Sequence, residues 1–169
     1  MREVFDQVLT SGRYILGPEV EALEAECGSY CGVEHAVGVS SGSDALILAL
    51  MALDVGPGDE VILPTFTFFA TAGAVSRLGA TPVFVDCDEK TYNVDAELLR
   101  AKITERTKVL MPVHLFGQCC DMPPILELAR EHGLKVVEDA AQAIGAEWRG
   151  ARAGSMGDVG CFSFYPTKN

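Results

Sequence analysis

Short β-branched runs alternate with helix-like segments through most of this chain, and this alternation limits its fold more than any other feature. The predicted strands, bounded by Gly, Pro, Asp or Asn, are residues 36–40, 61–63, 82–86, 109–114, 135–138 and 159–164. The predicted helices between them are residues 44–53, 67–78, 95–102 and 122–132. Strands that alternate with helices are typical of a parallel sheet with helical crossovers. We therefore predict an α/β fold.

Two of the predicted helices should differ in burial. After Gly17-Pro18, apolar residues recur at three- and four-residue intervals from Val20 to Tyr30 with glutamates between them. This spacing predicts an amphipathic helix on the outside. Residues 44–53 are apolar on every face after Asp44. A helix of that composition is expected to be buried among other elements.

The composition excludes several classes of protein. With 49% hydrophobic and 22% charged residues over 169 positions, the chain suits one globular domain with a substantial core. Its 24 acidic and 13 basic residues disfavour nucleic-acid binding. No apolar stretch approaches the roughly 20 residues of a membrane span, and no signal-peptide layout is present, so we expect a cytoplasmic protein. The six cysteines lack a partner pair at zinc spacing, so we expect reduced thiols and no metal site.

Polar residues gather directly after the predicted strands, and this pattern locates the candidate site. Open parallel sheets bind their ligands at the carboxyl ends of the strands. Residues 40–44, Ser-Ser-Gly-Ser-Asp, lie between a strand and the apolar helix. The backbone N–H groups of Gly42 and Ser43 could therefore hold a phosphate at the positive end of that helix. An ordinary N-cap by Ser43 is the alternative.

Further candidates follow the other strands. Asp139 ends a buried strand, where a carboxylate needs a cation or several donors, so it suggests a protonated ligand nitrogen nearby. A solvated loop aspartate is the alternative, with Glu138 and Asp139 on opposite sides of the strand. Phe68 could lie flat against a planar cofactor or belong to the core. His114 is expected to be a hydrogen-bonded structural residue. Lys168, in a turn after a strand, is placed to form a Schiff base with a carbonyl.

Three segments in this order resemble the sugar-nucleotide aminotransferases, the DegT-like group of pyridoxal-phosphate enzymes of fold type I. The segments are Ser-Gly-Ser-Asp-Ala-Leu at 41–46, Glu-Asp-Ala-Ala-Gln at 138–142, and a serine followed five residues later by a lysine at 163–168. The resemblance implies a three-layer αβα sandwich with a mostly parallel sheet, which is the large domain of these enzymes.

The resemblance also implies a role for each candidate residue. Lys168 would bind pyridoxal 5'-phosphate as a Schiff base and shuttle the proton between cofactor and substrate carbons. Asp139 would pair with the pyridine nitrogen, which makes the ring an electron sink. Gln142 would lie near the ring hydroxyl, and Phe68 would stack on the ring.

The implied phosphate site combines Ser163 with Gly42 and Ser43. The implied reaction transfers an amino group from an amino acid, such as L-glutamate, to a nucleotide-linked keto-sugar in polysaccharide or amino-sugar biosynthesis. One alternative is another fold type I enzyme, a lyase or a desulfurase, which would usually carry a histidine where this chain has Phe68. The other alternative is a non-catalytic regulatory or binding domain.

The resemblance carries an expectation about length as well. Proteins of this group are roughly twice as long and have a second domain. Residues 1–169 are therefore expected to form a partial cofactor-binding domain, without the C-terminal domain and without the antiparallel strand that follows the lysine. We expect this piece to have little activity alone, and the full-length protein to be a homodimer.

Overall fold

The computed structural model describes residues 2–168, which fall into two compact units, one up to Gly38 and one from Val39 onward. The first unit contains helices α1 (Arg2–Ser11) and α2 (Pro18–Cys31). Pro18 opens α2, where its missing N–H is not needed, and Gly32 ends it in the left-handed conformation with φ 75°. The helix predicted after Gly17-Pro18 is therefore confirmed.

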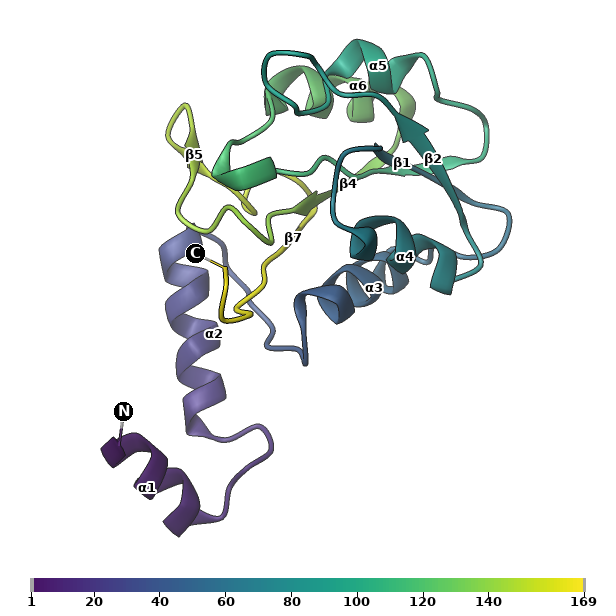
Figure 1. Ribbon diagram of the computed structural model, residues 1–169. Coiled ribbons are helices and arrows are strands. Elements are labelled where there is room, and N and C mark those ends of the chain that lie inside the picture. Colours follow the sequence, from purple (N-terminus) through teal and green to yellow (C-terminus); the bar gives the residue numbers. More distant parts are fainter. Residues whose placement is uncertain (1, 169) are drawn as a thin grey trace. The chain divides into compact units, whose positions relative to one another are not determined.

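The second unit is built on a five-stranded sheet in the order β2-β1-β3-β4-β7, and every neighbouring pair of strands is parallel (Figure 1). The strands are β1 (Glu60–Pro64), β2 (Thr81–Val85), β3 (Thr107–Leu110), β4 (Lys135–Asp139) and β7 (Val159–Cys161). The short strands β5 (Glu147–Trp148) and β6 (Ala151–Arg152) pair with each other as an antiparallel hairpin, which is a separate two-stranded sheet. The predicted parallel sheet is confirmed.

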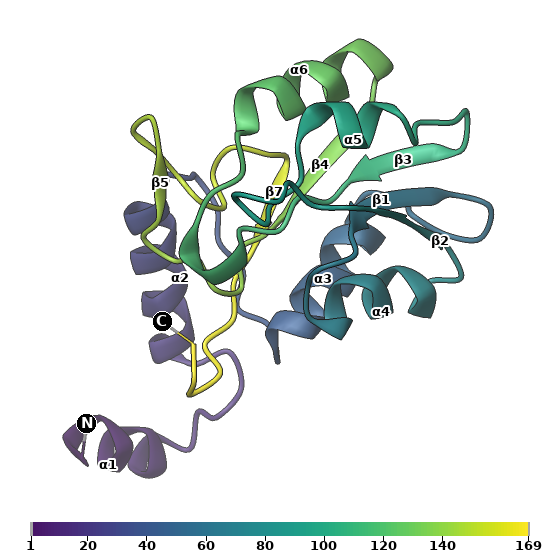
Figure 2. The same cartoon turned by 45° about the horizontal axis from the view of Figure 1, so that its top comes forward.

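Helices cover both faces of this sheet (Figure 2). Helices α3 (Gly42–Ala52) and α4 (Phe69–Arg77) lie on one face, and α5 (Ala96–Arg100) and α6 (Met122–His132) lie on the other. Alternate strand residues explain the two cores: Val61 and Leu63 pack with α3 and α4, whereas Ile62 packs with α5 and α6. The unit is thus the three-layer αβα sandwich that the resemblance implied.

Two predictions about local structure are wrong. Residues 36–40 do not form a strand, because no strand in residues 2–168 pairs with them; the N–H of Gly38 donates instead to the Glu24 carboxylate, 2.6 Å away. The apolar helix α3 is also not buried on every face. It rests on one face of the sheet, so Leu46 and Leu50 are buried while Leu48 and Met51 remain exposed.

No helix among residues 2–168 has the length and hydrophobicity to cross a bilayer.

Candidate active site

The candidate residues lie on loops that leave the same edge of the sheet. Because β1, β3, β4 and β7 are parallel, their carboxyl ends meet at one edge. Residues 65–68, 140–142 and 162–168 follow β1, β4 and β7 there, and residues 111–118 follow β3. The topology therefore brings together residues that are as many as a hundred positions apart in the chain.

Asp139 is the last residue of β4, and it is 5% exposed. Its Oδ2 accepts a hydrogen bond from Thr71 Oγ1 at 2.7 Å, and its Oδ1 accepts a longer one from the Ala141 N–H at 3.3 Å. Burial raises the pKa of Asp139, and the Thr71 hydrogen bond and the positive charge of Lys168 partly offset that effect. The alternative of a solvated loop aspartate is wrong.

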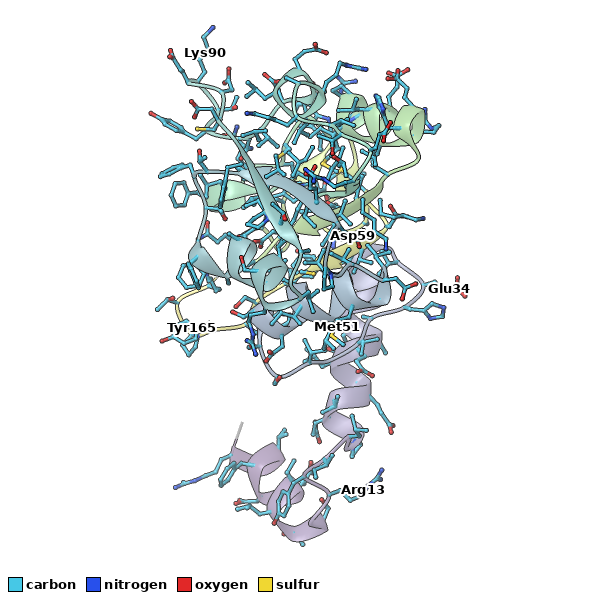
Figure 3. The ribbon with its side chains drawn as sticks, turned by 90° about the vertical axis from the view of Figure 1, so that its right-hand side faces the viewer. Arg13, Glu34, Met51, Asp59, Lys90 and Tyr165 are labelled. Atoms are coloured by element: carbon cyan, nitrogen blue, oxygen red, sulfur yellow. The ribbon has the colours of Figure 1, made fainter. Side chains whose placement is uncertain are left out.

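Lys168 lies in a turn after β7 that is closed by its own N–H, which donates to the Tyr165 carbonyl at 2.8 Å. The Tyr165 side chain lies at the surface (Figure 3). The Lys168 Nζ lies 5.9 Å from the centroid of the Phe68 ring, within the range of a cation–π contact. Phe68 is 69% exposed, so the alternative that it belongs to the core is wrong. The structure therefore brings Lys168, Phe68 and Asp139 together.

The start of α3 meets the segment after β7. Ser41, not Ser43, caps this helix: its Oγ accepts from the Asp44 N–H at 3.1 Å. A Cβ placed on Gly42 would lie 2.7 Å from the Cβ of Ser163 and 3.1 Å from its Oγ. Within residues 2–168 the N–H groups of Gly42 and Ser43, in the first turn, have no acceptor. Ser163 therefore adjoins two free donors at the positive end of a helix.

Gln142 is held by the loop after β3. Its Oε1 accepts from the Phe116 N–H at 3.0 Å, and Phe116 adopts a left-handed conformation with φ 52°. Gly117, also left-handed at φ 87°, lies against the Gln142 backbone carbonyl. With its carbonyl oxygen engaged, Gln142 has its amide NH₂ left to donate to a ligand.

A fully buried histidine and glutamate lie under this edge. The His114 Nδ1 accepts from the Cys120 N–H at 3.1 Å, so Nε2 carries the proton that is donated to Glu138 Oε2 at 2.7 Å. The Glu138 carboxylate also accepts from the N–H groups of Gly154, Met156 and Gly157 at 2.6–2.8 Å. The prediction that His114 is a hydrogen-bonded structural residue is confirmed.

Burial opposes ionisation of Glu138 and raises its pKa, but the hydrogen bonds from His114 and the loop amides outweigh burial and bring the pKa below its usual value. Sequence reasoning missed both this loop contact and the hydrogen bond from Thr71 to Asp139. The second had a faint signal, since a threonine near the start of a predicted helix that follows a strand lies close to the ligand edge.

With this geometry in place, comparison with known proteins decides the family. The sequence profile of the DegT/DnrJ/EryC1/StrS aminotransferase family matches residues 1–169. The chain belongs to this family. A UDP-N-acetyl-3-dehydro-alpha-D-glucosamine 3-aminotransferase of Acidithiobacillus ferrooxidans is 57% identical over 163 residues, which are 96% of this chain and 44% of that protein.

Solved structures of family members agree with this assignment. The structure of DesV from S. venezuelae, in complex with a ketimine intermediate, matches with a TM-score of 0.94 and 55% identity over 96% of this chain and 44% of DesV. The PLP form of a putative sugar aminotransferase from Streptococcus pneumoniae matches with a TM-score of 0.92 and 35% identity over 96% of this chain and 45% of that one. The chain thus spans less than half the length of the family members that it matches.

Proposed function

We propose that the full-length protein is a pyridoxal-phosphate-dependent aminotransferase that acts on a nucleotide-linked keto-sugar. The observation that carries this proposal is the convergence of the Lys168 amine, the exposed Phe68 ring and the buried Asp139 carboxylate at one edge of the sheet. The sugar substrates in the names of similar family members support the substrate class.

The residues at this edge fit the cofactor. A buried carboxylate whose pKa is raised gains from a cation, and a protonated pyridine nitrogen would supply one to Asp139. Phe68 offers an exposed ring to a planar group. The close approach of Gly42 and Ser163, beside the free N–H groups of the first helical turn, fits a phosphate.

Each residue then has a defined task. When bound, pyridoxal phosphate supplies a ring that accepts electrons from the carbon that loses its proton. The Lys168 Nζ would hold the cofactor aldehyde covalently and then, as a free amine, move the proton. Asp139 would hold the proton on the ring nitrogen. Ser163 and the Gly42 and Ser43 N–H groups would orient the phosphate, and the Gln142 NH₂ would donate to the ring hydroxyl.

We further propose L-glutamate as the amino donor and a homodimer as the working assembly, both of which the family resemblance implies, together with the cytoplasmic location expected from the sequence. The test is to incubate the purified full-length protein with pyridoxal phosphate, L-glutamate and UDP- or dTDP-linked 3-keto-sugars. The expected products are the amino-sugar nucleotide and 2-oxoglutarate in equal amounts. Release of sulfide from cysteine or of an aldehyde from threonine would instead favour a desulfurase or a lyase. The absence of any borohydride-stable cofactor adduct would favour a non-catalytic domain.

Asp139→Asn should lower kcat by about 10²-fold or more, because a neutral amide does not keep the ring nitrogen protonated. The cofactor-free variant should nevertheless be as stable as the wild type or more so at neutral pH. The folded pKa of Asp139 is raised, so its ionisation costs stability as the pH rises past the ordinary carboxyl range. Steady-state turnover and thermal unfolding of the cofactor-free protein measure the two effects. Full turnover in the variant would contradict the role of Asp139.

Gly42→Ala should weaken the binding of pyridoxal phosphate by about 10-fold, because the new methyl group overlaps Ser163 and overpacking of this kind costs about 1–3 kcal/mol. Gly56→Ala is a matched control, since a Cβ at Gly56 meets no atom within 4 Å. Fluorescence titration of both variants with the cofactor measures the difference. Equal affinity in the two variants would contradict a phosphate site at Gly42.

A further inference from the structure

We propose that Thr71 is a positioning residue, which acts with Thr67 to fix the Asp139 carboxylate for the ring nitrogen of the cofactor. This inference rests on the proposed function and adds to it a pair of hydroxyls that act on Asp139. The two threonines belong to the loop after β1 and the first turn of α4, whereas Asp139 ends β4. The contact therefore joins two elements across the sheet edge, 68 residues apart in the chain.

The hydrogen bonds between these three side chains run in one direction. An ionised carboxylate can only accept, so Thr71 Oγ1, 2.7 Å from Asp139 Oδ2, must donate its proton there. Thr67 Oγ1 lies 2.8 Å from Thr71 Oγ1 and must then donate to it. A hydroxyl that both accepts and donates is polarised by its partner, which strengthens its bond to the carboxylate. Thr71 is fully buried, so water does not compete for this donor.

Within residues 2–168, the Thr71 hydroxyl bonds two side chains and no backbone carbonyl of its own helix. A threonine hydroxyl within a helix ordinarily bonds a carbonyl one turn earlier or faces solvent. Here the hydroxyl is directed across the edge of the sheet to a residue of another element. That direction separates the contact from the usual local role of a helical threonine.

The contact leaves one oxygen of Asp139 available. Oδ2 is held at 2.7 Å, while Oδ1 has only the longer hydrogen bond from Ala141. Fixing Oδ2 sets the direction of Oδ1, the oxygen left to accept from a protonated nitrogen. A hydroxyl carries no net charge, so it stabilises the ionised carboxylate without neutralising its charge. A lysine or arginine at the same place would neutralise that charge. The positive charge of Lys168 also favours the ionised form of this carboxylate.

The test compares pyridoxal phosphate with 1-deazapyridoxal phosphate, in which a C–H replaces the ring nitrogen, in the full-length protein. The wild type should bind the natural cofactor more tightly than the analogue. Thr71→Val, which keeps the shape of the side chain, should weaken binding of the natural cofactor by about 10-fold, the lower end for a hydrogen bond to a charged group. It should leave the affinity for the analogue unchanged. Thr71→Ser should restore discrimination to within about twofold, and Thr67→Val should give a smaller loss than Thr71→Val.

Each other outcome overturns the inference. Equal weakening of both ligands by Thr71→Val would assign Thr71 a purely structural role, and unchanged affinity for both would assign it none at the cofactor. Thr71→Ala provides the same comparison if the valine variant does not fold. A wild type that fails to discriminate between the two ligands would overturn the Asp139 assignment of the proposed function as well. Failure of the Thr71 inference alone leaves wild-type discrimination intact.

Discussion

Lys168→Ala in the full-length enzyme should lower kcat by at least about 10³-fold and abolish covalent capture of the cofactor by borohydride. The variant loses both the amine that binds the aldehyde and the base that moves the proton, and general-base catalysis alone typically contributes about 10²–10⁴-fold. Mass spectrometry after borohydride reduction, with turnover on the same samples, measures both losses. Cofactor affinity should fall less than kcat, because Ser163, the start of α3 and Asp139 remain.

Lys135→Ala is the matched control for this experiment. Lys135 begins β4, at the opposite end of the strand from Asp139, and its Nζ pairs with Asp158 at 2.7 Å near the surface. An exposed pair of this kind contributes about 1 kcal/mol or less to stability, so turnover should stay near the wild-type rate. A Lys168→Ala enzyme that keeps a tenth of the wild-type kcat would contradict the proposed chemistry.

Glu138→Gln should destabilise the protein by about 3 kcal/mol or more. The carboxylate accepts from His114 and from three amides of residues 154–157, and all of these donors are satisfied only by its two oxygens. An amide of the same size turns an NH₂ group towards two of these donors, and each buried donor left without an acceptor costs about 1–3 kcal/mol. Chemical denaturation measures the loss, and hydrogen exchange at residues 154, 156 and 157 shows whether that loop opens first.

The control is Glu127→Gln on the exposed side of α6, where the same change should stay within about 0.5 kcal/mol. The pH dependence adds a second measurement. The folded pKa of Glu138 is lowered, so its contribution is present above the pKa of the unfolded chain and is lost as the pH falls through the folded pKa. The stability difference between the wild type and Glu138→Gln should therefore narrow in acid. A constant difference would mean that the charge of Glu138 contributes nothing.

Local pattern was sufficient to predict much of this fold. β-Branched runs and Gly or Pro boundaries identified the five strands of the sheet, and parallel pairing then placed Lys168 and Asp139 at one edge. The prediction of a strand at residues 36–40 was wrong because a strand forms only where a partner strand pairs with its backbone. The sequence pattern of one segment does not show whether such a partner exists.

The details of the site were less predictable. Either Ser41 or Ser43 satisfies the cap preference, and only the backbone conformation, extended at Ser41, decides between them. Two contacts depend on how elements that are distant in the sequence pack together. They are the hydrogen bond from Thr71 to Asp139 and the hydrogen bonds from the amides of residues 154–157 to Glu138. Helix α3 was expected to be buried all round, but contact with a sheet covers a single stripe of a helix.

The neighbouring carboxylates of β4 make this strand intolerant of changes in length. Both oxygens of Glu138 accept hydrogen bonds from His114 and the loop amides. Asp139, on the opposite side of the strand, has one oxygen held by Thr71 and one with only a longer hydrogen bond. A single inserted or deleted residue ahead of them would exchange their sides. Glu138 would then face the ligand site instead of residues 154–157, and Asp139 would be buried on the opposite side of the strand. A change of one residue in length would therefore impair both folding and catalysis.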